Sequence, residues 1–184
     1  LAELGRQAIM ADPEWRNGAY LQHSVRPTRG GSVARTAAQL AGLAPDEVRA
    51  RFEGARTKER FAFNADNAND TARQQGAGFV DRFDANSYLY LSRAMDQFDL
   101  AEHGAGSLDA AFAKFRGVQR SLVLGAQTDM LYTIDQQTLI AEHLRQAGVA
   151  VEFHAFPSPQ GHDAFLVDNA RFEPAIAGFL AKVG

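Results

Sequence analysis

The chain has 184 residues, 46% of them hydrophobic, which suffices for one buried core and fits one domain or part of a larger one. Its formal net charge of −3 excludes the strongly basic surface of nucleic-acid-binding proteins, and no apolar stretch reaches the ~20 residues that span a membrane, so we predict neither partner. The absence of cysteine excludes disulfides and thiolate metal sites and is consistent with a cytoplasmic protein.

Helices are expected in parts of the N-terminal region. A helix over residues 1–11 ends at Asp12-Pro13, because the residue before a proline is disfavoured in the α region. A loop over residues 15–31 leads to a helix from 32 to about 40, and residues 45–77 carry no clear pattern. The chain starts without methionine and within a helix-like pattern, which indicates a piece of a longer protein.

Two further helices are predicted before the first strand. Apolar side chains at helical spacing follow Asp84 and form one helix face: Tyr88, Leu91, Met95 and Phe98. Ser107 caps a short second helix, which ends at Gly117 and buries four side chains: Leu108, Ala111, Phe112 and Phe115.

After these helices the chain alternates between strand and helix. Residues 121–125 form an apolar strand. The next helix starts at a capping box of Thr133 and Gln136 and is closed by Gly148. Residues 149–156 form the second strand.

The last predicted helix begins near Pro174, a favourable residue in a first turn. It is expected to bury four apolar side chains: Ile176, Phe179, Leu180 and Val183. Strand, helix, strand and helix in this order predict a right-handed crossover unit of a parallel sheet, and therefore an α/β fold. We assign this unit to residues 118–184 and a helical region to residues 1–117.

Two polar residues follow the two strands. Asp129 comes after the first, and His162 lies after the second, in the run from Pro157 to Leu166. Ligands bind outside the carboxyl ends of parallel strands, and an Asp and a His at such positions are the last two members of a Ser–Asp–His triad. In the alternative interpretation, Asp129 is a helix-entry residue and His162 a surface loop residue. No His, Asp and Glu cluster has metal-ligand spacing, so no metal is expected.

A nucleophile for this triad is not evident. Ser32 lies in Gly30-Gly31-Ser32-Val33-Ala34, which is faintly similar to the G-x-S-x-G elbow of hydrolases. An elbow follows an apolar strand, and residues 21–29 do not form one. We therefore expect Ser32 to cap the following helix, and a nucleophilic serine to lie upstream of this chain.

Four runs, taken together, carry a family resemblance: Arg6-Gln7-Ala8-Ile9 with Asp12-Pro13, Arg82 to Leu89, Ala94-Met95-Asp96 with Phe98-Asp99, and Gly161 to Leu166. They resemble the homoserine O-acetyltransferase family of α/β-hydrolase-fold acyltransferases, which includes homoserine O-succinyltransferases and serine O-acyltransferases. The resemblance covers essentially the whole of this chain, which corresponds to the C-terminal half of a typical family member. It implies the C-terminal part of an α/β-hydrolase fold preceded by a helical lid, in a cytoplasmic homodimer.

The resemblance also implies a reaction. Acyl-CoA, as co-substrate rather than bound cofactor, acylates a serine, and the hydroxyl of L-homoserine then takes the acyl group in methionine synthesis. The resemblance implies that this group is acetyl. By motif match Asp129 and His162 are catalytic, Arg35 binds the substrate carboxylate and Asp163 binds its ammonium group. From the residues alone, Arg35 would be a solvated helix residue and Asp163 a loop cap.

The chain departs from the family pattern in the region of the lid. Asn69 to Gln74 replaces the usual run before Gln75-Gly76, Gly54 to Lys58 does not match, and Gly31-Ser32 stands where the family has Gly-Leu before Arg35. Three rival functions stay open: a serine O-acyltransferase of acetyl or succinyl groups, an esterase, and a catalytically inactive domain.

Overall fold

The chain folds into two compact units. In this computed structural model the described residues are 1–52 and 78–183. Unit 1 comprises Leu1–Ala41 and Val48–Phe98, and unit 2 comprises Gly42–Glu47 and Asp99–Gly184. The expected boundary at residue 117 falls inside unit 2, because the helix before it packs into the core of that unit. The interpretation of residues 1–117 as a lid stays a prediction.

Unit 1 is helical in its described part. Its elements are α1 (Ala2–Met10), the 3-10 helices η1 (Pro13–Gly18) and η2 (Tyr20–His23), α2 (Thr28–Gly42) and α5 (Ala85–Gln97). The last residue of α2, Gly42, is assigned to unit 2, and α3 (Pro45–Phe52) begins in unit 2 and continues into unit 1. Buried Arg6 joins α1 to α5 through an ion pair of 2.5 Å with Asp96 and a hydrogen bond of 3.2 Å to the hydroxyl of Ser92. The apolar stripe predicted on α5 is largely exposed, since Leu91, Met95 and Phe98 are each more than half accessible.

The second helix begins earlier than the sequence predicted. α2 starts at Thr28, so Ser32 lies inside the helix, and the cap assigned to Ser32 is wrong. The glycines that indicated a loop serve helix packing instead: a Cβ on Gly30 would lie 2.4 Å from the carbonyl oxygen of Ala8. The Gly30 N–H donates to the Asp12 carboxylate at 2.9 Å, so Asp12 supplies the hydrogen bond that the prediction gave to a serine.

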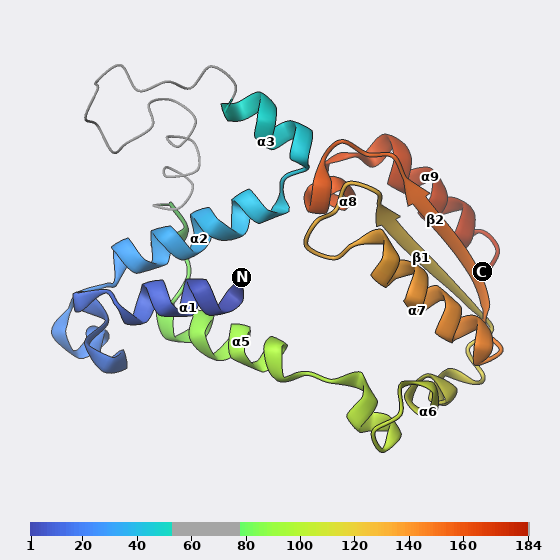
Figure 1. Ribbon diagram of the computed structural model, residues 1–184, viewed down its shortest axis with the longest axis horizontal. Helices are drawn as coiled ribbons and strands as arrows, with labels where there is room; N and C mark the ends of the chain where they lie inside the picture. The colour runs from blue at the N-terminus through green and yellow to red at the C-terminus, as the bar shows by residue number, and fades with distance from the viewer. Residues whose placement is uncertain (53–77, 184) are drawn as a thin grey trace. The chain divides into compact units, whose positions relative to one another are not determined.

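Unit 2 contains the sheet. Parallel strands β1 (Arg120–Ala126) and β2 (Ala150–Phe156) pair with Val123 opposite Phe153, and α7 (Ile134–Gln146) connects them. The remaining elements are η3 (Leu100–Gly104), α6 (Leu108–Phe112), η4 (Ala113–Phe115), η5 (Gly161–Asp163), α8 (Ala164–Val167) and α9 (Asn169–Leu180). Figure 1 shows α7 on one side of the strands and α9 on the other. The predicted strand–helix–strand–helix order is confirmed.

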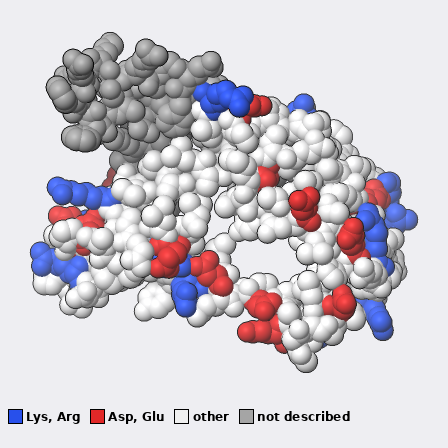
Figure 2. Space-filling model, in the orientation of Figure 1, with Lys and Arg blue, Asp and Glu red and all other residues white. Residues whose placement is uncertain are grey.

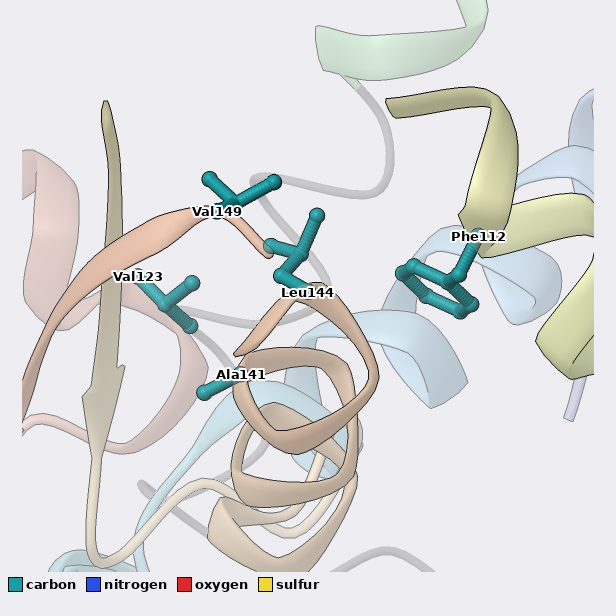
Figure 3. Packing of buried hydrophobic residues seen from close by; sticks show 5 residues of the cluster. All are labelled: Phe112, Val123, Ala141, Leu144 and Val149. Carbon is teal, nitrogen blue, oxygen red and sulfur yellow. The ribbon is translucent and has the colours of Figure 1, made fainter. Parts of the chain in front are cut away.

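Each face of the sheet has its own apolar core, because side chains alternate between the faces of a strand. Figure 3 shows the first core, where α6 and α7 meet the strands through Phe112, Val123, Ala141, Leu144 and Val149. The second core lies under α8 and α9 and consists of Ala126, Ala164 and Phe172, with Leu124 and Phe156 packed against it. These cores hold the carboxyl ends of both strands in place.

The start and the buried face of the last helix were predicted wrongly. α9 begins at Asn169 and holds Pro174 in its interior. Its buried apolar residue is Phe172, whereas three of the four predicted residues are 42–58% exposed: Ile176, Leu180 and Val183. In the described residues the sheet has two strands, so there is little apolar surface for α9 to cover beyond the contact of Phe172 with Phe156.

The surface carries charges of both signs. Figure 2 shows Lys and Arg in small groups among Asp and Glu on the visible face of the described residues, without a broad field of one sign. None of the described helices combines the length and the apolar character required to cross a membrane.

Candidate active site

The two residues predicted to be catalytic lie side by side. Asp129 follows β1 in a turn, where its N–H donates to the carbonyl of Ala126 at 3.2 Å. His162 lies in η5, after β2. Its Nδ1 is 2.9 Å from Oδ2 of Asp129, although 33 residues separate the two along the chain. The parallel pairing of β1 and β2 brings both strand ends to the same edge and so produces this contact.

The Asp129 carboxylate is held from two sides. Its Oδ1 accepts backbone hydrogen bonds from Leu131 at 2.8 Å and from Tyr132 at 2.9 Å, which leaves Oδ2 for His162. An ionised carboxylate only accepts hydrogen bonds, so Nδ1 of His162 carries the proton in this contact. The Nε2 lone pair is then free to take a proton from a nucleophile, as a general base requires.

A pocket of about 300 Å³ adjoins the pair and is lined by Asp129, Tyr132, His162, Phe165 and other residues of unit 2. The His162 ring lies 5.3 Å from the Tyr132 ring and 5.8 Å from the Phe165 ring, measured between centroids. The Asp129 side chain is 11% exposed and that of His162 28%, so the aspartate is shielded while the histidine reaches the pocket. This arrangement suits an orienting acid and a base that meets substrate.

A second polar group, absent from the sequence predictions, joins the segment before His162 to the start of α9. Ser158 is fully buried, and its hydroxyl donates to Oδ2 of Asp168 at 2.6 Å. This hydrogen bond, with Arg171 at 2.6 Å, holds the pKa of the Asp168 carboxyl below its ordinary value. Stability from this contact is therefore present above the ordinary carboxyl pKa and is lost as pH falls through the lowered value.

Gly161 allows the histidine loop to lie against the segment Gly42–Glu47 of the same unit. Its φ is +62°, and a Cβ there would lie 2.5 Å from the carbonyl oxygen of Gly42 and 2.7 Å from the nitrogen of Ala44. Both neighbours are backbone atoms, which cannot rotate away. Glycine is thus required at Gly161 for its conformation and for space.

We expect Gly161→Ala to lower the free energy of unfolding by about 2–4 kcal/mol, from the left-handed backbone and the clash together. Urea unfolding measures this loss. Gly148→Ala is the matched control, because Gly148 also has positive φ, +87°, but no atom within 4 Å of its Cβ position. The control should lose only about 1–2 kcal/mol, and equal losses would show that the backbone of residues 42–44 does not press on the histidine loop.

The other predicted site residues are distributed over both units. Ser32 and Arg35 belong to α2 of unit 1, where the Arg35 guanidinium carbon lies 5.4 Å from the centre of the Phe79 ring. Asp163 is exposed and directly follows His162 in unit 2. Their substrate contacts stay predictions, and the departures noted at residues 54–58 and 69–76 lie outside the described residues.

Within the part of the chain that the structure describes, no group of three His, Cys, Asp or Glu side chains could hold a metal ion. His162 has its one hydrogen bond there with Asp129, and no described serine hydroxyl is bonded to the ring.

No protein-family model matches the chain. Among curated proteins, the homoserine O-acetyltransferase of Caulobacter vibrioides (strain NA1000 / CB15N) is 46% identical over 183 residues, which are 98% of this chain and 48% of the relative. The serine O-succinyltransferase of Litchfieldella anticariensis is 45% identical over 190 residues, 98% of this chain and 50% of the relative. The chain therefore spans about half the length of the curated relatives it matches.

Solved structures share the fold. The crystal structure of homoserine O-acetyltransferase from Bacillus anthracis superposes with a TM-score of 0.85 at 22% identity, over 97% of this chain and 48% of that one. Esterase E22 gives a TM-score of 0.77 at 20% identity, over 95% of this chain and 48% of that one. At these identities the likeness shows the fold alone, and it confirms the predicted α/β-hydrolase class.

Proposed function

We propose that this chain, a homologue of the C-terminal half of the homoserine O-acetyltransferases, supplies the aspartate and histidine of an O-acyltransferase. The reaction moves an acyl group from acyl-CoA to the hydroxyl of L-homoserine. The observation that carries the proposal is the hydrogen bond of 2.9 Å between His162 Nδ1 and Asp129 Oδ2 beside an open pocket. Sequence identity of 46% to a relative named homoserine O-acetyltransferase supports the choice of reaction.

The first half-reaction acylates a serine that we place outside these 184 residues. Nε2 of His162 takes the serine proton as the hydroxyl oxygen attacks the thioester carbonyl. When the carbon–sulfur bond breaks, the imidazolium returns that proton to the departing CoA sulfur. Asp129 holds the ring in the productive tautomer and stabilises its positive charge during both transfers.

The second half-reaction repeats these roles with a different nucleophile. His162 takes the proton of the homoserine hydroxyl as that oxygen attacks the acyl-serine ester. The serine oxygen leaves with the proton from the imidazolium, which regenerates the enzyme and releases O-acyl-homoserine. Acetyl-CoA as donor, methionine synthesis as pathway and a cytoplasmic homodimer belong to the proposal through the family resemblance alone.

Recognition of the amino-acid acceptor is assigned to two charged residues. Arg35 binds the carboxylate of homoserine with its forked donors, and Asp163 binds the ammonium group. Support for Asp163 is its place next to His162, with an exposed side chain. For Arg35 the support is the motif match, while its contact with Phe79 offers a competing structural role.

The test of this assignment uses the complete protein, meaning the longest translated chain that contains these residues. Arg35→Ala is expected to lower kcat/KM for the amino acid ~10- to 150-fold, because a charge-assisted hydrogen bond contributes roughly 1.5–3 kcal/mol. Hydrolysis of p-nitrophenyl acetate, a neutral ester, should stay nearly unchanged. Arg29→Ala, an exposed arginine of the same helix, is the matched control.

Equal losses on both substrates would make Arg35 a structural residue and favour the esterase alternative. The same assay compares acceptors, because the relative from Litchfieldella anticariensis is named a serine O-succinyltransferase. If kcat/KM is higher for serine than for homoserine, with either acetyl- or succinyl-CoA, then serine is the acceptor and the proposal of homoserine is wrong.

A further inference from the structure

We propose that Thr128 is a positioning residue, whose hydroxyl holds the histidine loop so that His162 meets Asp129. This inference rests on the proposed function in that it takes His162 to be the base. Thr128 directly precedes Asp129 at the end of β1, and its hydroxyl contacts the loop that carries His162. A single side chain thus connects the two catalytic loops beside their point of contact.

The Thr128 hydroxyl makes two hydrogen bonds of opposite direction. It donates to the carbonyl oxygen of Ser158 at 2.5 Å and accepts from the N–H of Gly161 at 3.1 Å. Ser158 and Gly161 are the two ends of the turn that leads into His162. One hydroxyl therefore binds both ends of this turn to the residue that precedes Asp129.

The far side of the turn is anchored independently. The Ser158 hydroxyl donates to Asp168 at 2.6 Å and accepts from the N–H of Gln160 at 3.4 Å. Asp168 is itself paired with Arg171 at 2.6 Å and precedes α9. The turn is thus held between α9 on one side and the Thr128 hydroxyl on the other, and only the second anchor reaches the Asp129 loop.

Loss of the Thr128 hydroxyl should displace the His162 ring more than it lowers the free energy of unfolding. Without Thr128, the Gly161 N–H and the Ser158 carbonyl lose a partner, and a buried unpaired backbone group moves to regain one. His162 follows Gly161 directly, so its ring moves with that N–H. Misplacement of a catalytic group by about 1 Å can cost on the order of 100-fold in rate.

The test combines a spectroscopic and a kinetic measurement on the complete protein. Thr128→Val keeps the shape of the side chain and removes the hydroxyl, and Thr128→Ser restores the hydroxyl. Thr138→Val makes the same change in α7, where the hydroxyl donates to the Ile134 carbonyl at 2.9 Å. Nitrogen-15 NMR of the His162 imidazole reports which ring nitrogen carries the proton. The signals that disappear in His162→Ala identify this ring among the histidines. Far-UV circular dichroism shows whether each variant is folded.

For Thr128→Val we expect a mixture of tautomers in place of protonated Nδ1, and a kcat for acyl transfer that falls ~10- to 100-fold with little change in KM. Thr128→Ser should restore tautomer and rate to within about threefold, and Thr138→Val should change neither. The inference is overturned if Thr128→Val keeps the single tautomer, if serine does not rescue it, or if Thr138→Val has the same effect. A complete protein that shows no acyl transfer would refute the proposed function, while the NMR comparison would still decide the role of Thr128.

Discussion

His162→Ala in the complete protein is expected to lower kcat for acyl transfer by about 10⁴-fold or more, with the fold retained. The substitution removes the group that takes the proton from both nucleophiles in turn. The His162 ring reaches a pocket, where it contacts Asp129, Tyr132 and Phe165. His162 belongs to neither apolar core of unit 2, so its loss leaves both cores intact.

Asp129→Asn should lower kcat by about the same factor for a different reason. Two backbone N–H groups hold Oδ1 in place, so the amide oxygen of asparagine takes that position and its NH₂ group faces His162. Nδ1 must then accept a hydrogen bond, which places the proton on Nε2 and removes the base. Steady-state rates with acetyl-CoA and homoserine measure both losses.

The chain offers a matched control for these two variants. His143 Nδ1 lies 2.9 Å from Oδ1 of Asp109 in unit 2, a second approach of a histidine to an aspartate that lacks the hydrogen-bond geometry of the first. Asp109→Asn makes the same substitution away from the pocket and should leave kcat within about twofold of the wild type, because the Asp109 side chain is 76% exposed. A near-wild-type rate in Asp129→Asn or His162→Ala, or an equal loss in Asp109→Asn, would show that the triad assignment is wrong.

The strands and the contact between Asp129 and His162 could be predicted from the sequence because their signals are local. A short apolar run marks β1, and the hydrogen bond of 3.1 Å from the Thr133 N–H to Gln136 confirms the predicted capping box. Parallel strands then place Asp129 and His162 at one edge by topology alone.

Predictions failed where long-range contacts decide the outcome. Gly30 lies inside α2 because the backbone of α1 approaches it, and no pattern near Gly30 encodes that contact. Thr128 and Ser158 were missed for the same reason: their partners are 30 or more residues away for Thr128 and ten for Ser158. Ser158 lies between two prolines, which favours a turn but does not indicate which residue anchors it.

The motifs that carry the family resemblance in unit 1 are architectural. Arg6 pairs with Asp96, Asp12 caps α2, and Asp84 caps α5 while it also accepts a hydrogen bond from buried Tyr20. Asn86 donates to the Gly18 carbonyl at 2.9 Å. These contacts hold the helices together, so the resemblance in this region argues for a shared fold, and the argument for chemistry comes from unit 2.

The isolated 184 residues are expected to transfer no detectable acetyl group from acetyl-CoA to homoserine. A triad without its nucleophile loses on the order of 10⁴-fold or more in rate, and an elbow also supplies a backbone N–H of the oxyanion hole. Among the described residues, no serine hydroxyl is hydrogen-bonded to His162. Ser158 is buried and donates to Asp168, and Ser32 lies inside helix α2, whereas a nucleophile elbow is a turn between a strand and a helix.

A thiol reagent that detects released CoA measures acyl transfer by the isolated chain. The background is low because these 184 residues contain no cysteine that would react with the reagent. The complete protein serves as the positive control under the same conditions. Turnover by the isolated chain that disappears in both Ser32→Ala and His162→Ala would contradict the prediction and make Ser32 the nucleophile. No turnover by the isolated chain, beside an active complete protein, would instead support a nucleophile outside these residues. Asp129 and His162 would then act on a serine that the rest of the protein places near Nε2 of His162.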